Sequence, residues 1–562
     1  MRCPPAASLG QRHQWAPQEE YFVRSCDTLL KIEGLEVRLP EGGDRPNAVE
    51  DFHLSLGRGE IVCVVGESGS GKSLMAQAVM GILPSNLPSP RGAVMFEDRN
   101  LLTLPDKERL DISGRRIAMI FQEPSAALNP IFRVGDQVAE VFRLHTGLSH
   151  NEARRRVVSL FSEVRLPDPE KIYQNYPHQL SGGQCQRVMI ATGLALEPAI
   201  LIADEPTTAL DVTTQAQILK LMLDLRERHG TGILFITHDF GVVADIADRV
   251  AVMQHGRLVE VGTKDEVLRR PKAGYTRSLI KAVPKLQPRE QNPHLGDWLV
   301  RAKGIVKTFD LTSIFQRGRS VTAVDKVSLE IRRGETLGLV GESGSGKSTF
   351  AQCIIRLVDP DEGLIELGDM TFSDLRGAAL RKARSRVQIV FQDPYTALDP
   401  RQKVVDAIAE GPIIHGVSKG VALKDAKELL RSVGLDANAG DRFPHEFSGG
   451  QRQRICIARA LALEPQLLIA DESVSALDVS VQAHILDLLE RMQKERGFSM
   501  LFITHDLRVA SRLCDRIAVM RHGRILEIAS PAELFSSPRE AYTRELLAAV
   551  PGRDWLQQLA PM

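Results

Sequence analysis

The pattern of apolar and polar residues along the chain predicts an α/β protein. Short, β-branched apolar runs alternate with longer amphipathic stretches. Residues 61–65 and 199–203 are two such runs, and each is typical of a buried strand. Between 199–203 and the next apolar run at 232–236, the apolar positions of residues 213–228 recur at helical spacing. Strands that alternate with helices in this way favour a largely parallel sheet covered by helices.

The same order of segments occurs twice in the chain. From residue 181 to residue 275, distinctive residues recur 267 positions later, so the halves run in register there. Upstream the separation is larger, 275 positions for Lys72 and 270 for Gln122. Length differences of this kind usually fall in surface loops, so we expect two copies of one domain.

A glycine-rich segment follows the strand predicted at 61–65. Residues 66–73 fit the spacing G-x-x-x-x-G-K-[ST], and residues 74–80 are helical in pattern. Glycines let backbone N–H groups curl around phosphate oxygens, Lys72 adds a positive charge, and the Ser73 hydroxyl suits Mg²⁺. An identical segment returns at 341–348, which makes a chance match negligible. The predicted phosphate-binding residues are Gly66, Glu67, Ser68, Gly69, Ser70, Gly71, Lys72, Ser73, Gly341, Glu342, Ser343, Gly344, Ser345, Gly346, Lys347 and Ser348.

An acidic pair ends one buried strand in each half. Asp204 and Glu205 follow 199–203, and Asp471 and Glu472 are their counterparts. The first acid of each pair can hold Mg²⁺, and the second can orient and deprotonate an attacking water. Taken alone, a solvated pair of acids at a strand end is an equal interpretation. With a phosphate loop upstream, the catalytic interpretation is favoured.

A serine followed by two glycines and a glutamine precedes a helical stretch in each half. These segments are Ser181, Gly182, Gly183 and Gln184, and Ser448, Gly449, Gly450 and Gln451. A helix start of this type can bind an anion, but an isolated S-G-G segment is more often a plain helix cap.

Length and composition narrow the class of protein. A chain of 562 residues suggests two to four domains, and 71 basic against 71 acidic residues argue against a large nucleic-acid surface. The seven cysteines have no C-x-x-C spacing, and no apolar run reaches 18 residues, so partner chains would have to supply any membrane span. We predict a tail at 1–27, a first nucleotide-binding domain at 28–284, a linker at 285–297, a second domain at 298–551 and a tail at 552–562.

The order of motifs resembles that of the ABC transporter ATPases. The phosphate loop, Gln122, the L-S-G-G-Q segment, the acidic pair and His238 follow one another, and both halves carry the set. The resemblance covers nearly the whole chain. It implies two tandem P-loop NTPase domains, each with a mainly parallel sheet and a helical subdomain. It also implies an ATPase that binds ATP with Mg²⁺.

The resemblance further implies that the halves pair head to tail around two ATP sites. One site would join the phosphate loop, Gln122, Asp204, Glu205 and His238 of the first half to Ser448–Gln451 of the second; the other would join the counterparts to Ser181–Gln184. The implied catalytic residues are Glu205, Glu472, His238, His505, Gln122 and Gln392. The implied Mg²⁺ ligands are Ser73, Gln122, Asp204, Ser348, Gln392 and Asp471.

Within the family, the chain resembles the peptide-import branch, and closely the tandem ATPases of glutathione and dipeptide importers. Segments 121–130, 391–402 and 444–465 carry this likeness, as do the Y-T-R segments at Tyr275 and Tyr542, for which a packed terminal helix is an equally good interpretation. The likeness implies a peripheral subunit at the cytoplasmic face of the inner membrane. It would power uptake of dipeptides, oligopeptides or glutathione through two permease subunits, served by a periplasmic or extracellular binding protein.

Other functions of the family stay open at this point. A soluble tandem ATPase of translation or DNA repair is one alternative. An ATPase for metal uptake or export is another. The choice among peptide substrates is also open, because the permeases and the binding protein would select it.

One departure from the family pattern predicts unequal ATP sites. Members of the family stack an aromatic ring on adenine; Phe309 is placed for this in the second half, whereas the first half offers Leu39. Ring stacking contributes about 0.5–1.5 kcal/mol beyond burial. We therefore expect the Lys72 site to bind ATP more weakly than the Lys347 site. ATP titrations of Lys72→Ala and Lys347→Ala chains measure the remaining site, and equal affinities would contradict the prediction.

Overall fold

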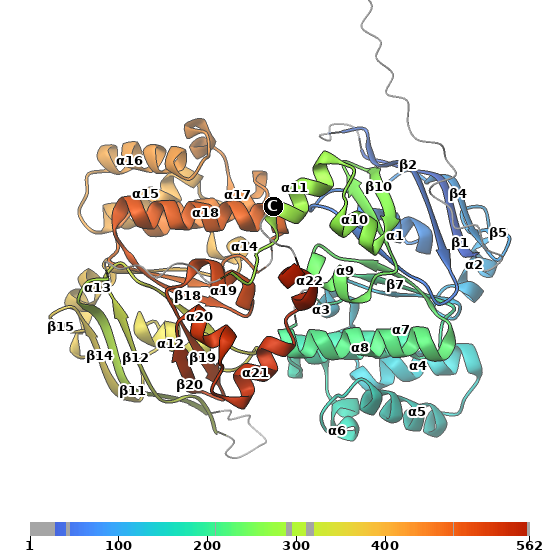
Figure 1. Ribbon diagram of the computed structural model, residues 1–562, viewed down its shortest axis with the longest axis horizontal. Helices are drawn as coiled ribbons and strands as arrows, with labels where there is room; N and C mark the ends of the chain where they lie inside the picture. The colour runs from blue at the N-terminus through green and yellow to red at the C-terminus, as the bar shows by residue number, and fades with distance from the viewer. Residues whose placement is uncertain are drawn as a thin grey trace, which may run out of the picture.

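The computed structural model describes residues 28–40, 45–207, 210–287, 295–310, 320–475 and 477–558. The predicted tail at 1–27 and residues 288–294 of the predicted linker lie outside the described residues. Two similar halves lie side by side, and their helical parts point to opposite ends of the molecule (Figure 1).

The first half contains a four-stranded antiparallel sheet and a six-stranded, mostly parallel sheet. In spatial order the strands are β2 (Asn47–Gly57), β1 (Thr28–Arg38), β4 (Arg91–Phe96) and β5 (Arg99–Asn100), and then β10 (Arg257–Thr263), β9 (Arg249–Gln254), β3 (Ile61–Val65), β8 (Gly232–Ile236), β7 (Ile200–Asp204) and β6 (Ile117–Ile120). The helices are α1 (Lys72–Met80), α2 (Asp106–Ile112), α3 (Pro124–Ala127), α4 (Val134–Thr146), α5 (His150–Glu163), α6 (Pro169–Gln174), η2 (Pro177–Gln179), α7 (Gly182–Leu194), α8 (Val212–His229), α9 (Phe240–Ile246), α10 (Lys264–Arg269) and α11 (Gly274–Ala282).

The second half repeats both sheets. Its strands are β12 (Ser320–Arg332), β11 (Trp298–Asp310), β14 (Glu362–Leu367) and β15 (Met370–Thr371), and then β16 (Val387–Val390), β17 (Leu467–Asp471), β18 (Ser499–Thr504), β13 (Thr336–Val340), β19 (Arg516–Arg521) and β20 (Arg524–Ala529). Its helices are α12 (Lys347–Ile354), η3 (Phe372–Asp374), α13 (Gly377–Arg384), α14 (Pro394–Ala397), α15 (Val404–Ile414), α16 (Lys419–Ser432), η4 (Ala437–Asp441), η5 (Pro444–Glu446), α17 (Gly449–Leu461), α18 (Val479–Arg496), α19 (Leu507–Leu513), α20 (Pro531–Ser536), α21 (Ala541–Ala548) and α22 (Arg553–Gln558).

The α/β class and the parallel core predicted from the sequence are confirmed. Every residue of β3 and β7 is buried, as expected for strands covered on both faces. The helix predicted at 213–228 is α8, whose start is fixed because the Asp211 carboxylate accepts a hydrogen bond from the Thr214 N–H at 2.9 Å. It ends at Gly230, which has a φ of +63° that favours glycine.

The antiparallel sheet of each half was not predicted. The apolar runs of β1 and β2 are broken by polar residues, and register shifts interrupt their pairing. The predicted helical subdomain is present. Its helix α5 begins after Ser149, which forms a capping box with Glu152, and its counterpart α16 starts at Lys419.

The chain crosses between the halves twice. After α11, Leu286 packs against the apolar core of the second half. At the other end of the chain, α22 returns and contacts α9 (Figure 1), and Trp555 and Leu556 join the core of the first half. The Gly552 N–H donates to Asp245 at 2.9 Å. Most of the segment predicted as a tail at 552–562 is therefore this packed helix, and residues 559–562 lie outside the described residues.

No helix among the described residues is long and apolar enough to cross a membrane.

The packing of α22 predicts that Trp555 holds the halves together. Trp555 is 7% exposed, and truncation of a buried tryptophan costs about 3 kcal/mol or more unless the surroundings collapse. We expect Trp555→Ala to lower the unfolding temperature and to speed hydrogen exchange in α22 and α9. Gln557→Ala, on the exposed side of the same helix, is the control. Equal exchange in the two variants would contradict the role of Trp555.

Candidate functional site

The predicted site segments of each half follow the carboxyl ends of adjacent parallel strands. In the first half the phosphate loop follows β3, His238 follows β8, Glu205 follows β7 and Gln122 follows β6. Because these strands are neighbours and run in one direction, their loops meet at one edge of the sheet. The second half places its counterparts in the same way after β13, β18, β17 and β16.

The phosphate loop requires glycine immediately before its helix. Gly71 has a φ of +104°, and a Cβ atom there would lie 2.2 Å from the carbonyl oxygen of Ala48. Gly346 has a φ of +102° and would bring a Cβ atom to 2.1 Å from the carbonyl oxygen of Ala323. A side chain at either position would push the loop away from the strand beside it.

The loop lysine lies inside the curve of its own loop. Lys72 Nζ donates to the carbonyl oxygens of Gly66 at 2.8 Å and Glu67 at 2.9 Å, and Lys347 makes the same two contacts in the second half. Burial lowers the pKa of Lys72, against the opposing effect of nearby carboxylates. The ammonium group is thus held within the loop that the sequence predicts to bind phosphate.

A hydroxyl and a carboxylate form the candidate metal position. Ser73 Oγ donates to Asp204 Oδ1 at 3.1 Å, and Ser348 Oγ donates to Asp471 Oδ1 at 3.0 Å. Burial raises the pKa of Asp204 to about 6, although the bond from Ser73 opposes the shift. One carboxylate and one hydroxyl fit Mg²⁺ in a nucleotide site, since this ion takes few protein ligands and completes its shell with phosphate and water.

The second acid of each pair is held on two sides. Gln122 Nε2 donates to Glu205 Oε2 at 3.1 Å, and His238 Nδ1 lies 3.3 Å from Glu205 Oε1. The backbone of Glu205 has a φ of +46°, which costs about 1–3 kcal/mol for a residue with a side chain. Burial works to lower the pKa of His238, but the hydrogen bond to Glu205 and the negative charges of Glu205 and Asp239 together raise it.

The second half repeats this cluster with small differences. Gln392 Nε2 donates to Glu472 Oε2 at 2.8 Å, and His505 Nδ1 lies 3.7 Å from the same oxygen. Glu472 has a φ of +45°. Burial works to raise the pKa of Glu472, but His505 and Lys347 hold it below its usual value.

Contacts across the interface between the halves, called the seam below, join each phosphate loop to the other half. Ser480 Oγ donates to Glu67 Oε1 at 2.5 Å, and Thr213 Oγ1 donates to Glu342 Oε1 at 2.5 Å. Ser480 and Thr213 occupy equivalent positions 267 residues apart. Neither hydroxyl was predicted from the sequence. Their recurrence two positions after the aspartates Asp211 and Asp478 is the signal that could have revealed them.

A tyrosine from the Y-T-R segment reaches each phosphate loop. The Tyr275 hydroxyl accepts a hydrogen bond from the Glu67 N–H at 3.2 Å, and the Tyr542 hydroxyl accepts one from the Glu342 N–H at 3.1 Å. Both helices are also packed at the end of their half, so the packing interpretation holds as well.

The serine of each S-G-G-Q segment lies at the start of a helix, α7 in the first half and α17 in the second. Ser181 Oγ accepts from the Gln184 N–H at 3.3 Å, and Ser448 Oγ accepts from the Gln451 N–H at 3.4 Å. Among the described residues, the hydrogen bonds of these serines stay within their own helix starts. Both serine residues are exposed.

The aromatic candidate Phe309 is 40% exposed on β11, with Lys307 Nζ 5.6 Å from its ring centre. Its counterpart Leu39 packs at the edge of the apolar core of the first half.

The fold and the two site clusters define a P-loop ATPase built twice in one chain. The family model described as "ABC transporter" matches residues 49–208 and 324–475, and the model "Oligopeptide/dipeptide transporter, C-terminal region" matches residues 259–302. The chain belongs to the ABC transporter family of ATP-binding proteins. Like other members, it binds and hydrolyses ATP.

Curated relatives match along almost the entire chain. The glutathione import ATP-binding protein GsiA of Salmonella paratyphi A is 46% identical, over 94% of this chain and 90% of that protein. GsiA of Escherichia coli K12 is 45% identical, over 93% of this chain and 89% of that protein. A solved dimeric ATP-binding cassette bound to ADP and Pi is 30% identical over 42% of this chain and 99% of its own, with a TM-score of 0.38.

The matching clusters predict that both halves hydrolyse ATP. Loss of a general base typically lowers the rate about 10²–10⁴-fold at its own site. We expect Glu205→Gln and Glu472→Gln each to leave at most about half of the turnover, and the double variant to be inactive. Glu197→Gln is the control, because Glu197 also has a positive φ, of +49°, but lies exposed outside the site. Full turnover in either single variant would show that its half is not hydrolytic.

Proposed function

We propose that this protein is the ATP-hydrolysing subunit of an importer for short peptides, with glutathione or a similar small peptide as the cargo. The observation that carries the proposal is the match to glutathione import ATP-binding proteins over nearly the full length of both chains. The model for the C-terminal region of oligopeptide and dipeptide transporters supports it, because its match includes Tyr275, which contacts a phosphate loop.

In the proposed cycle, each ATP lies between the halves. Lys72 and the loop N–H groups bind phosphate, and Gln122 and His238 hold the Glu205 carboxylate for an attacking water. Water attacks the γ-phosphorus, its proton passes to Glu205, and the bond to the β-phosphate oxygen breaks. Ser448–Gln451 complete this site, and Ser181–Gln184 complete the site built on Lys347. Mg²⁺ would be held by Ser73 and Asp204, with Gln122, in one half. Their counterparts Ser348 and Asp471, with Gln392, would hold it in the other half. The ion would supply positive charge to neutralise the phosphates.

The proposed partners are two permease subunits at the cytoplasmic face of the inner membrane. They would dock beside the two glutamine segments, 121–130 with Gln122 and 391–402 with Gln392. Exposed apolar side chains support this in the first half, where Ile131 is 73% and Phe132 is 54% exposed. The second half has Arg401 and Gln402 at the equivalent positions, and Tyr395 is exposed nearby. Because the two faces differ in polarity, we expect the two permease contacts to differ. A substrate-binding protein outside the cell would deliver the cargo to the permeases.

The function is tested by purifying the chain together with its permeases and measuring ATP turnover. We expect glutathione or a dipeptide, presented by the binding protein, to raise turnover several-fold. The Glu205→Gln/Glu472→Gln chain with the same partners is the blank. If ribosomes or nucleic acid co-purify in place of membrane subunits, or if no peptide raises turnover, the importer proposal is wrong.

The docking face is tested separately by substitution. We expect Ile131→Asp/Phe132→Asp to abolish co-purification with the permeases while ATP binding by the chain is unchanged. Leu110→Asp is the matched control, since Leu110 is 68% exposed on α2 and lies outside the segment that carries Ile131 and Phe132. Retained co-purification in the Ile131/Phe132 variant would contradict this docking face.

A further inference from the structure

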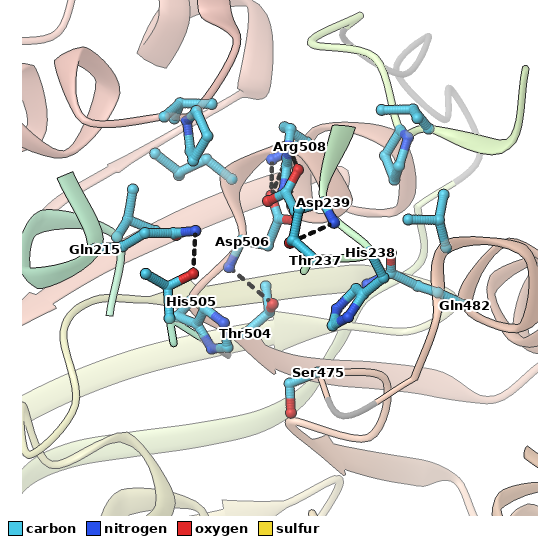
Figure 2. Close-up of a pocket in the computed structure, with 18 of the residues that line it drawn as sticks. Gln215, Thr237, His238, Asp239, Ser475, Gln482, Thr504, His505, Asp506 and Arg508 are labelled. Atoms are coloured by element: carbon cyan, nitrogen blue, oxygen red, sulfur yellow. Dashed lines mark hydrogen bonds and ion pairs between the residues drawn. The ribbon is translucent and has the colours of Figure 1, made fainter. Parts of the chain in front are cut away.

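One arginine bridges the two halves beside a cavity that residues of both halves line. Arg508, near the start of α19, donates from Nη1 and Nη2 to the two carboxylate oxygens of Asp239, each at 2.9 Å. It also donates to Asp506, from Nε at 3.1 Å and from Nη2 at 2.9 Å (Figure 2). Arg508 is only 8% exposed. A bidentate arginine pair of this kind fixes both distance and orientation.

The two acids are the same residue of the repeated domain. Asp239 and Asp506 lie 267 positions apart, and each caps the helix that follows it. Two carboxylates that face one another in a buried space repel strongly unless a positive charge lies between them. Burial works to raise the pKa of Asp239, but the charge and hydrogen bonds of Arg508 hold it below its usual value. The two negative charges therefore depend on one arginine.

Only the second half carries the arginine. The equivalent position in the first half is Gly241, where a Cβ atom would lie 2.5 Å from the carbonyl oxygen of Pro551 and 2.7 Å from Arg508 Nη1. The segment that leads into α22 and the guanidinium group fill that space. Two identical chains would bring two arginines or none to this point, so the bridge depends on halves that differ.

The bridge is one residue away from both catalytic clusters. His238 precedes Asp239 and contacts Glu205, and His505 precedes Asp506 and contacts Glu472. Both histidines, together with Arg508, line one small cavity of about 80 Å³ at the seam (Figure 2). Side-chain contacts and two peptide links, His238–Asp239 and His505–Asp506, thus connect one catalytic glutamate to the other through Arg508.

We propose that Arg508 is a positioning residue that couples the two ATP sites, so that a displacement of one histidine segment is passed to the other. The proposal rests on the proposed use of both histidines and glutamates in hydrolysis, but not on the identity of the cargo. Coupling between sites is a free-energy difference that needs a physical link with two arrangements. The acid–arginine–acid bridge is a direct link of this kind between the histidine segments.

Residual turnover in chains with one disabled site measures the coupling. In the native chain we expect Glu205→Gln to stall both sites, leaving less than about a tenth of the turnover, in line with coupling of about 5–150-fold. The residual share is the turnover of a Glu205→Gln chain divided by that of the same chain with Glu205 intact. Adding Arg508→Met, which keeps the bulk of the side chain but not its charge, should raise this share towards about half, the value for independent sites. A merely structural loss would lower turnover and would not raise the residual share.

Three further variants sharpen the test. Arg512→Met is the matched control, because Arg512 lies on the same helix but pairs with Asp487 of its own half. It should leave the residual share low. Asp239→Asn keeps a helix cap but loses the charge, and should act like Arg508→Met. Arg508→Lys keeps the charge and should restore part of the coupling.

The outcomes separate cleanly. If Arg508→Met or Asp239→Asn folds and leaves the residual share below a tenth, or if the native chain already keeps half of its turnover in the Glu205→Gln variant, the coupling role is wrong. Should Arg508→Met lower the unfolding temperature too far for assay, Asp239→Asn decides. The ratio needs only purified full-length chain and MgATP, so it remains defined even if no peptide proves to be the cargo.

Discussion

The structure depends on the interface between the two halves, where each phosphate loop hydrogen-bonds to the opposite half. The carboxylate of Glu67 accepts a hydrogen bond from Ser480, and that of Glu342 accepts one from Thr213. A loop whose glutamate bonds to the opposite half reports the state of the seam directly. In the proposed cycle, a nucleotide phosphate bound at such a loop acts on both halves at once, as in other switches biased by a single phosphate group.

The seam combines two kinds of contact with different physical properties. Apolar packing by Leu286 and by Trp555 and Leu556 is non-directional and involves none of the predicted ATP-site residues. The hydrogen bonds at the loops and the Arg508 bridge are directional, and a small displacement weakens them steeply. The segments that carry Leu286, Trp555 and Leu556 can therefore keep the halves together, while the polar contacts can respond to the binding and hydrolysis of ATP.

The parts of the site that follow from local sequence could be predicted, and the parts that depend on how the halves meet could not. The phosphate loop, the strand β3 and the helix α8 follow from spacing and periodicity within a few turns of chain. By contrast, the contacts of Thr213 and Ser480, and the contact of Arg508 with Asp239, join residues more than a hundred positions apart. The recurrence of the two hydroxyls marks their positions, but the local sequence does not show which residues they bind. Tyr275 lies between these cases, because its segment was noticed but its hydroxyl contact with Glu67 needed the fold.

The central claim, that each ATP site is shared between halves, is tested most directly by counting trapped ATP in paired variants. The test uses a Glu205→Gln/Glu472→Gln chain. In it, Lys72→Ala disables one phosphate loop, and arginine in place of Ser181 or Ser448 disables one S-G-G-Q segment. If each S-G-G-Q segment completes the site of the opposite half, Lys72→Ala with Ser448→Arg damages only one site and leaves one ATP bound per chain. Lys72→Ala with Ser181→Arg then damages both sites and leaves no ATP bound. The reverse result, with one ATP retained by the Ser181 pair and none by the Ser448 pair, would show that each half binds ATP by itself.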